Sequence, residues 1–241
     1  MPSDTSLQLS HWLLAATGTR LFLCHENRIP AAGPLLVISN HRSFMDAPLL
    51  MTAIGRPIRF ACHHYMGQVP ILKEIVVEKL GCFPLASLEN RQRNFFQQAA
   101  QLLQAQQAVG VFPEGAEPML HLTRPNQVGD FQRGFAHLAL RAAVQDLAIL
   151  PIAIAVTEEE LLSSFPVRWL SLFDPSEPLF IQDGWHPMVV YKRVQVLIGK
   201  PFWIKSSLQK DYQGKDARTL VTDLTEYCRS EVCNLIAQGY Y

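Results

Sequence analysis

The sequence has no excess of charge of either sign and few charged residues. Among its 241 residues, 21 are Lys or Arg and 21 are Asp or Glu, so the formal net charge is zero. Charged residues make up 17% of the chain, against roughly 25% in an average soluble protein. Without surplus positive charge the chain has little with which to neutralise phosphates, which argues against a nucleic-acid partner. A hydrophobic content of 49% also excludes a disordered chain.

Cysteine is missing from the patterns that build disulfide frameworks or zinc sites. The five cysteines are scattered and show no C-x-x-C spacing. We therefore expect reduced thiols, a cytoplasmic location and neither a metal nor a redox cofactor. The triplet Cys62-His63-His64 carries ligand-type side chains. On a strand its first and third residues would face one way and the second the other, so we predict a structural or pocket-lining role.

We also expect neither a signal peptide nor a membrane-spanning run. The N-terminus has no basic region, and the uncharged stretch from Thr5 to Thr19 is shorter than the ~20 apolar residues that cross a bilayer. We predict instead an amphipathic helical segment over residues 1–30, followed by one α/β domain over residues 31–241. The segment either lies in a membrane interface, as in a peripheral membrane protein, or packs on the domain.

Short apolar runs alternate with helical patterns along the rest of the chain. The expected strands are 35–39, 58–62, 82–85, 109–112, 148–156 and 194–198, and the expected helices are 44–54, 69–80, 90–108, 131–145 and 217–235. The strands are almost continuously apolar, as buried parallel strands are. The sequence therefore predicts an α/β fold with a mixed, largely parallel sheet flanked by helices. Residues 157–189 are predicted to be irregular, with Glu158-Glu159-Glu160 in a solvated loop.

The first motif with chemical potential is Asn40-His41-Arg42-Ser43-Phe44-Met45-Asp46, directly after an expected strand. On one continuous helix His41 and Asp46 would lie about 140° apart. They can meet if His41 lies on the turn before the helix and Asp46 lies in its first turn. A hydrogen bond from one ring nitrogen to Asp46 would leave the other nitrogen free to act as a base. The alternative is that both residues only cap the helix.

The second motif is Phe112-Pro113-Glu114-Gly115, which follows another expected strand. Ligands of open α/β sheets bind at the carboxyl ends of strands. A tight loop with a glycine can present a carboxylate and bare backbone N–H groups there. Alone, the motif is equally compatible with an ordinary turn.

Together and in this order, the two motifs resemble the first and third signature blocks of the glycerolipid acyltransferases, which include lysophosphatidate and other lysophospholipid acyltransferases. The resemblance covers about residues 35 to 200. It continues in Arg59–Cys62, Pro70–Leu72, Leu80–Leu85, Phe131–Ala139 and Ile149–Ala153.

The resemblance implies transfer of a fatty acyl group from acyl-CoA or acyl-carrier protein to a hydroxyl of a lipid acceptor at a membrane surface, without cofactor or metal. It implies that His41 is the general base and Asp46 its orienting partner. The residues it implies for substrate binding are Asn40, Arg42, Ser43, Phe112, Pro113, Glu114, Gly115 and Arg133.

Two departures from the family pattern concern the acceptor. The third block usually continues with a small residue and an Arg, where this chain has Ala116-Glu117, and the second usually ends in an Arg at the position of Ser87. Neither Ser nor Glu can replace the bidentate contacts of Arg to phosphate. We therefore expect an acceptor whose phosphate is absent, masked in a diester or held differently, for example by Arg42 or Arg133. A glycolipid or another hydroxylated lipid fits.

Two other functions remain open on the sequence. The same residues would serve a thioesterase-like hydrolase that uses water as the acceptor, or a lipid-binding protein that has lost catalysis. The aromatic stretch Phe165–Trp185 would be an acyl-chain lid, an interfacial anchor or a loop packed on the sheet.

Overall fold

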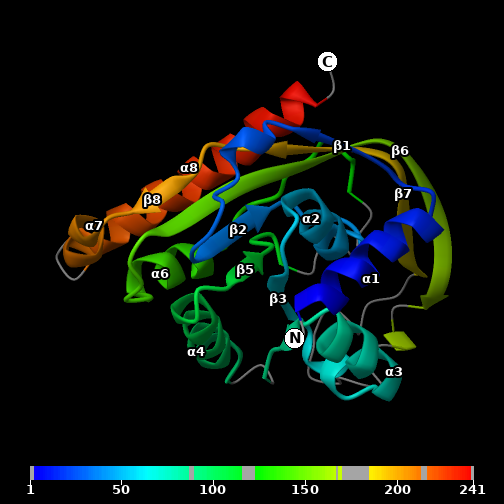
Figure 1. Ribbon diagram of the computed structural model, residues 1–241, viewed down its shortest axis with the longest axis horizontal. Helices are drawn as coiled ribbons and strands as arrows, with labels where there is room; N and C mark the ends of the chain where they lie inside the picture. The colour runs from blue at the N-terminus through cyan, green and yellow to red at the C-terminus, as the bar shows by residue number, and fades with distance from the viewer. Residues whose placement is uncertain are drawn as a thin grey trace.

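A computed structural model of the chain describes residues 3–86, 90–115, 123–166, 168–169, 185–212 and 216–239 (Figure 1). Helical and extended segments alternate, as predicted. The helical elements are α1 (Ser3–Ala16), η1 (Glu26–Arg28), α2 (Asp46–Ile54), η2 (His64–Gly67), α3 (Pro70–Leu72), η3 (Lys73–Lys79), α4 (Arg91–Gln104), α6 (Gly134–Arg141), α7 (Ser206–Asp211) and α8 (Ala217–Gln238). The strands are β1 (Arg20–Cys24), β2 (Leu35–Ser39), β3 (Ile58–Cys62), β4 (Phe83–Pro84), β5 (Ala108–Val111), β6 (Leu147–Pro166), β7 (Trp185–Ile198) and β8 (Phe202–Ile204).

The strands form one mixed sheet in the order β1-β7-β6-β2-β5-β3-β4, with β8 paired to β6. The central pairs, β6 with β2, β2 with β5 and β5 with β3, are all parallel. Strand β7 runs antiparallel to β6, and β1 runs parallel to β7 at the edge. The predicted fold class, a mixed and largely parallel sheet flanked by helices, is confirmed.

Helices cover both faces of this sheet. Buried residues of α4, α6 and α8 form a core on one face, and buried residues of α1 and α2 form a second core on the other. Strand β2 lies between them, and all five of its residues are buried. Its side chains alternate between the two cores, with Leu36 and Ile38 in one and Leu35 and Val37 in the other. The uninterrupted apolar sequence of β2 is therefore explained by burial on both faces.

The prediction that residues 157–189 are irregular is wrong in its described part. Strand β6 continues to Pro166 and β7 begins at Trp185, and the two strands pair as a long antiparallel ribbon that curves past the body of the sheet (Figure 1). Three successive glutamates look like loop sequence because strands at the centre of a sheet are apolar. A two-stranded ribbon beyond the sheet has solvent on one side and accepts such residues. Most of the aromatic stretch lies outside the described residues.

The N-terminal helix is shorter than the predicted helical segment over residues 1–30. It ends at Ala16, and Gly18, two residues later, takes a left-handed conformation, φ 67°. Residues 20–24 then form β1 and add a parallel strand to the sheet, so this stretch belongs to the α/β domain. In the described part of the chain, no helix has both the length and the apolar character needed to cross a bilayer.

Two smaller predictions, for Cys62-His63-His64 and for residues 131–145, also differ from the structure. Cys62-His63-His64 does not form one strand, because β3 ends at Cys62 and a 3-10 turn begins at His64. The helix expected at 131–145 spans only Gly134–Arg141, because the backbone N–H of Gln132 donates to the carbonyl of Pro113 instead of joining the helix.

Candidate functional site

The two sequence motifs meet because their strands are neighbours. Strands β2 and β5 pair in parallel, with Ile38 opposite Val111, so their carboxyl ends lie at the same edge of the sheet. The backbone N–H of His41, just after β2, donates to Glu114 Oε1, just after β5, at 3.0 Å. The structure thus brings the first and second motifs into one site, at the position where open α/β sheets bind ligands.

His41 and Asp46 are in direct contact, as their spacing predicts. His41 lies on the turn before α2, and Asp46 is the first residue of that helix. His41 Nδ1 lies 2.8 Å from Asp46 Oδ2. The same oxygen accepts the backbone N–H groups of Arg42 at 2.7 Å and Ser43 at 2.8 Å. The carboxylate therefore folds the turn around itself and also orients the imidazole.

The surroundings of Asp46 define the tautomer of His41. Asp46 is fully buried, and its second oxygen, Oδ1, accepts the hydroxyl of Tyr191 at 2.7 Å. An oxygen that accepts two backbone N–H groups carries no proton of its own, so the ring nitrogen that faces it is the donor: Nδ1 carries the proton and Nε2 keeps its lone pair. No partner for Nε2 occurs among the residues described, and the His41 side chain is 15% exposed. This nitrogen can accept a proton from a bound molecule.

The His41 imidazole is stacked on the Phe112 ring, which is stacked in turn on the Phe60 ring. The His41 ring lies 4.0 Å from the Phe112 ring, nearly parallel at 9°, and Phe112 lies 4.9 Å from Phe60. Phe60 crosses β5 at Gly110, its partner in the parallel pair. A Cβ at Gly110 would lie 2.1 Å from the Phe60 ring, so the stack requires glycine there. Phe112, expected to bind substrate, lies against the His41 ring.

Glu114 connects the turn that carries His41 to the backbone at Gly129. Besides the His41 N–H, its carboxylate accepts the Gly129 N–H through Oε2 at 2.6 Å. Burial raises the pKa of Glu114 above its ordinary 4.5, and the two N–H groups oppose this rise. The carboxylate expected to contact the acceptor is thus occupied by two backbone donors. Gly115 adopts a left-handed conformation, φ 78°, that closes this tight turn.

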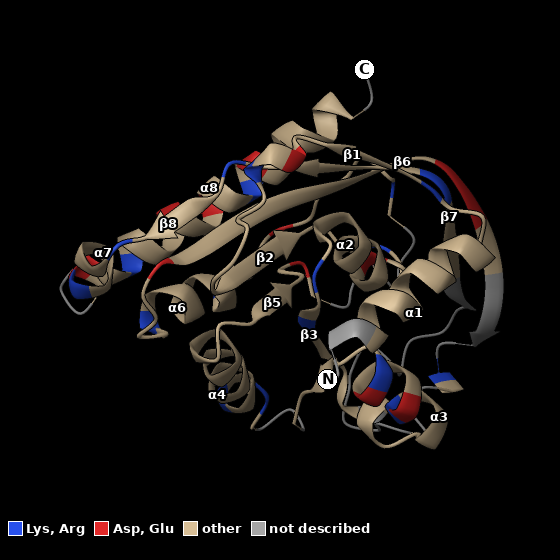
Figure 2. Ribbon diagram, viewed as in Figure 1, with Lys and Arg blue, Asp and Glu red and all other residues tan. Residues whose placement is uncertain are grey.

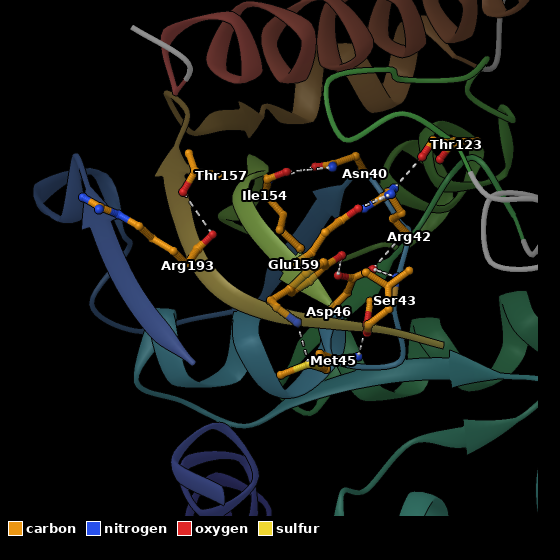
Figure 3. Close-up of polar contacts among 12 residues, drawn as sticks. Asn40, Arg42, Ser43, Met45, Asp46, Thr123, Ile154, Thr157, Glu159 and Arg193 are labelled. Carbon is orange, nitrogen blue, oxygen red and sulfur yellow. Dashed lines mark hydrogen bonds and ion pairs between the residues drawn. The ribbon is translucent and has the colours of Figure 1, made fainter. Parts of the chain in front are cut away.

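The polar side chains next to His41 bond to the protein's own β6–β7 ribbon (Figure 3). Asn40 exchanges two hydrogen bonds with the backbone of Ile154, at 2.9 and 3.0 Å. Ser43 donates to the carbonyl of Val189 at 2.6 Å. Asn40 and Ser43, both expected to contact substrate, are buried and act here as anchors of the turn.

Arg42 forms a bidentate ion pair with Glu159 of β6 (Figure 3). Its Nε also donates to the carbonyl of Thr123 at 2.7 Å. The prediction that Glu159 lies in a solvated loop is wrong: Glu159 is on a strand and its charge is neutralised by Arg42. A guanidinium with these partners has no unpaired charge to offer a phosphate.

The other expected substrate residues lie further along the same loop. Pro113 contributes its carbonyl to the Gln132 N–H. Arg133 lies at the start of α6 and lines a cavity with His137, Tyr212 and Arg218. Burial lowers the pKa of His137, and the nearby charges of Arg141 and Arg133 lower it further, which marks a positively charged region. Positions 87 and 116–118, where family arginines are replaced, lie outside the described residues.

Sequence reasoning missed two residues that touch the site, Tyr191 and Glu159. Both reach the turn from strands more than a hundred positions away along the chain. A tyrosine within an apolar strand looks like ordinary core packing, and no local pattern distinguishes it. Only the register of β6 and β7 places the pair beside Asp46 and Arg42.

The fold and the site together define an α/β protein with a His–Asp pair on the turn after a central strand. The chain belongs to the acyltransferase family, whose sequence model matches residues 22–155 and therefore includes both motifs. The family resemblance inferred from the sequence is confirmed.

Among curated proteins, the chain is 28% identical over 152 residues to the probable 1-acyl-sn-glycerol-3-phosphate acyltransferase of Mycoplasma genitalium, covering 61% of this chain and 52% of that protein. It is 26% identical over 133 residues to the chloroplastic 1-acyl-sn-glycerol-3-phosphate acyltransferase LPAT1 of Arabidopsis thaliana, covering 55% and 35%. The matches thus span about half of one relative and about a third of the other.

Among solved structures, the chain is similar to the 1-acyl-sn-glycerophosphate acyltransferase of Thermotoga maritima. The TM-score is 0.56 at 15% identity, and the match covers 95% of this chain and 78% of that chain. At this identity the likeness concerns the fold.

Proposed function

We propose that the protein transfers a fatty acyl group from an acyl thioester, acyl-CoA or acyl-carrier protein, to a hydroxyl of a lipid acceptor. The observation that carries the proposal is the His41–Asp46 pair, in which Nδ1 bonds to the carboxylate and the partly exposed ring leaves Nε2 without a partner among the described residues. Membership of the acyltransferase family supports the reaction class.

His41 is the general base of the proposed reaction. As the acceptor oxygen attacks the thioester carbonyl carbon, Nε2 takes the hydroxyl proton, and Asp46 stabilises the imidazolium that forms. The C–S bond then breaks, and the proton passes from Nε2 to the departing thiolate. Because the acceptor supplies the attacking oxygen, no Ser or Cys nucleophile is needed, and no acyl-enzyme forms.

The acceptor is proposed to be a glycerolipid or another hydroxylated lipid. The names of the curated relatives, both 1-acyl-sn-glycerol-3-phosphate acyltransferases, support a glycerolipid. Two features argue against a phosphate monoester held in the usual way: Ser87 and Glu117 replace the expected arginines, and Arg42 is paired with Glu159. We propose that a masked or uncharged headgroup, as in a diester or glycolipid, is preferred.

The proposed site of action is a membrane surface. Helix α1 carries hardly any charged residues (Figure 2) and contacts η3 of the neighbouring helical segment. Large apolar side chains are exposed on α1 and on α3, the short helix that contacts η3, with Trp12 at 73% and Ile71 at 69%. Phe44, three residues after His41, is 42% exposed. Exposed Trp and Ile side chains suit a lipid interface, where Trp is enriched.

The test is an acyl-transfer assay read by mass spectrometry. Acyl-CoA and acyl-carrier protein are offered against lysophospholipids, lysoglycolipids and neutral hydroxylated lipids, with the wild type, His41→Ala and a His25→Asn control. His25 is exposed and left-handed, φ 62°, a conformation that Asn tolerates. We expect an acylated lipid from the wild type and the control, and a loss of about 10²-fold or more in His41→Ala.

Three outcomes would contradict the proposal. Release of free fatty acid without a lipid product would identify a thioesterase-like hydrolase. Lipid binding that survives His41→Ala, with no turnover by the wild type, would identify a non-catalytic lipid-binding protein. Full activity of a folded His41→Ala variant would remove His41 as the base.

A further inference from the structure

The β6–β7 ribbon fixes the turn that carries His41. Ser43 donates to the Val189 carbonyl on β7, and Arg42 pairs with Glu159 on β6. Two further contacts come from Tyr191: its hydroxyl donates to Asp46 and its backbone N–H lies 3.3 Å from the sulfur of Met45. The family sequence model ends at residue 155, so these ribbon residues lie beyond it. The turn is held by a part of the chain that the family match does not include.

Tyr191 and Glu159 reach the turn as a cross-strand pair. They are directly opposite each other in the register of β6 and β7, so both side chains project from the same face of the ribbon. The register shifts between Val156 and Glu158 and again between Glu158 and Glu159. An irregularity of this kind changes which face of a strand a side chain occupies. Here it places Glu159 beside Arg42 while Tyr191 faces Asp46.

We propose that Tyr191 is a positioning residue for the reaction, which holds the Asp46 carboxylate through its hydroxyl and thereby adjusts how strongly His41 retains a proton. This inference rests on the proposed function, in which His41 is the base. Tyr191 is fully buried and its hydroxyl bonds to Asp46, so it acts on His41 through that carboxylate.

The geometry favours this role over simple packing. The Tyr191 side chain is fully buried, and its hydroxyl lies 2.7 Å from Asp46 Oδ1, the oxygen that the His41 ring does not use. Burial and the adjacent carboxylate raise the pKa of Tyr191 well above its ordinary 10.0, so the hydroxyl stays a donor at any working pH. A phenylalanine would fill the same volume without the hydrogen bond.

The direction of the pH effect follows from the charges around His41. Asp46 faces it from α2, Glu114 from the loop after β5, and the Arg42–Glu159 ion pair lies on the turn's other side. Removing the Tyr191 hydroxyl changes only the Asp46 oxygen. The carboxylate then attracts a proton more strongly, so the His–Asp pair holds its proton to higher pH. The acidic limb of the pH profile of kcat/KM therefore moves to higher pH.

The experiment compares wild type, Tyr191→Phe and two controls. Tyr227→Phe removes a hydroxyl from α8, on the other face of the sheet. Val196→Ala loses buried volume in the same core as Tyr191 without touching Asp46. One readout is the pH profile of acyl transfer. The other, independent of substrate, is an NMR titration of ¹³C-labelled histidine, with the His41 signal assigned by its absence in His41→Ala.

In Tyr191→Phe we expect the His41 titration and the acidic limb to move to higher pH by about half a unit or more. We also expect kcat to fall about tenfold with KM for the acceptor nearly unchanged, because an Asp46 carboxylate without the Tyr191 hydrogen bond orients the His41 ring less well. Both controls keep the wild-type titration. A Tyr191→Phe titration that coincides with that of Val196→Ala would overturn the inference while leaving the acyl transfer intact. If the wild type transfers no acyl group, the proposed function fails, and the NMR titration still decides whether Tyr191 acts on the His–Asp pair.

Discussion

Replacing Asp46 by Asn tests what the carboxylate contributes beyond its shape. Its Oδ2 accepts three hydrogen bonds, from the His41 ring and from the backbone N–H groups of Arg42 and Ser43. In Asp46→Asn the amide oxygen must take this position, because an NH₂ group there would face two N–H donors. The NH₂ group then points to the Tyr191 hydroxyl, which can accept as well as donate. The His41 tautomer is therefore kept, and what is lost is the negative charge.

The size of the loss follows from Coulomb's law. A unit charge about 4 Å from the imidazolium contributes about 4 kcal/mol at an effective dielectric constant of about 20. Since about 1.4 kcal/mol corresponds to a tenfold rate change, the loss in kcat/KM is at most about 10³-fold. The neutral amide oxygen still accepts from Nδ1, so we expect about 10²- to 10³-fold. Because the imidazolium is less stabilised, the acidic limb moves to lower pH, opposite to the shift expected for Tyr191→Phe.

The assay is acyl transfer across pH on Asp46→Asn, Asp46→Ala and wild type, with thermal unfolding of each. We expect Asp46→Asn to remain folded, with a stability loss of about 1–3 kcal/mol. Asp46→Ala leaves the turn's N–H groups and the Tyr191 hydroxyl without an acceptor and is the less stable of the two. Wild-type kinetics in a folded Asp46→Asn would refute the argument that the carboxylate charge stabilises the base.

Three further variants test the acceptor, the linkage of Glu114 to stability, and the membrane surface. Glu159→Gln removes the charge that neutralises Arg42, so in a mixed-lipid competition the yield from phosphate monoesters should rise about tenfold over neutral lipids; an unchanged ratio would exclude Arg42 from headgroup choice. Because burial raises the pKa of Glu114 above 4.5, the folded state binds its proton more tightly, and this stabilisation is complete below pH 4.5 and lost as pH rises through the folded-state pKa. The stability advantage of wild type over Glu114→Gln in chemical denaturation should therefore shrink from about pH 4 to about pH 7, and a constant difference would contradict it. Replacing Trp12 and Ile71 by Ser should reduce flotation with liposomes without changing thermal stability by more than about 0.5 kcal/mol; equal flotation would place the membrane contact elsewhere.

The sequence predicts best the strands that are buried on both faces of the sheet. Strand β2 is apolar at every position because both faces of the sheet are covered, and this makes it recognisable without any partner. The ribbon beyond the sheet lacks this burial on both faces, so the pattern of Glu158–Glu160 predicts a loop although these residues form part of β6. The pattern of residues 20–24 predicts a helical segment because Leu21, Phe22 and Leu23 continue the apolar character of the residues before them. Their pairing with β7, about 170 positions away, made them a strand.

The same distinction applies to the site. His41 and Asp46 lie five residues apart, so one turn brings them together and the chemistry is visible in the local sequence. The partners of Asp46 and Arg42 on the ribbon depend on strand register, which no short motif encodes. The motif predicts that Phe112 and Glu114 lie near His41, but a short motif leaves the direction of each side chain undetermined. Phe112 lies against the His41 ring and Glu114 binds backbone.

The directions of the side chains on the turn separate the chemistry from the choice of acceptor. Asn40, Arg42, Ser43 and Asp46 are buried and bond to the protein itself, whereas His41 and Phe44 are its partly exposed residues. The turn therefore presents His41 Nε2 to a ligand, while its other polar side chains form hydrogen bonds within the protein. Substitution of the buried residues should lower kcat for every acceptor alike, because all acceptors use the same base. While Glu159 neutralises Arg42, discrimination between headgroups has to come from residues outside this turn, so the His–Asp pair can remain unchanged while the acceptor differs from that of the relatives.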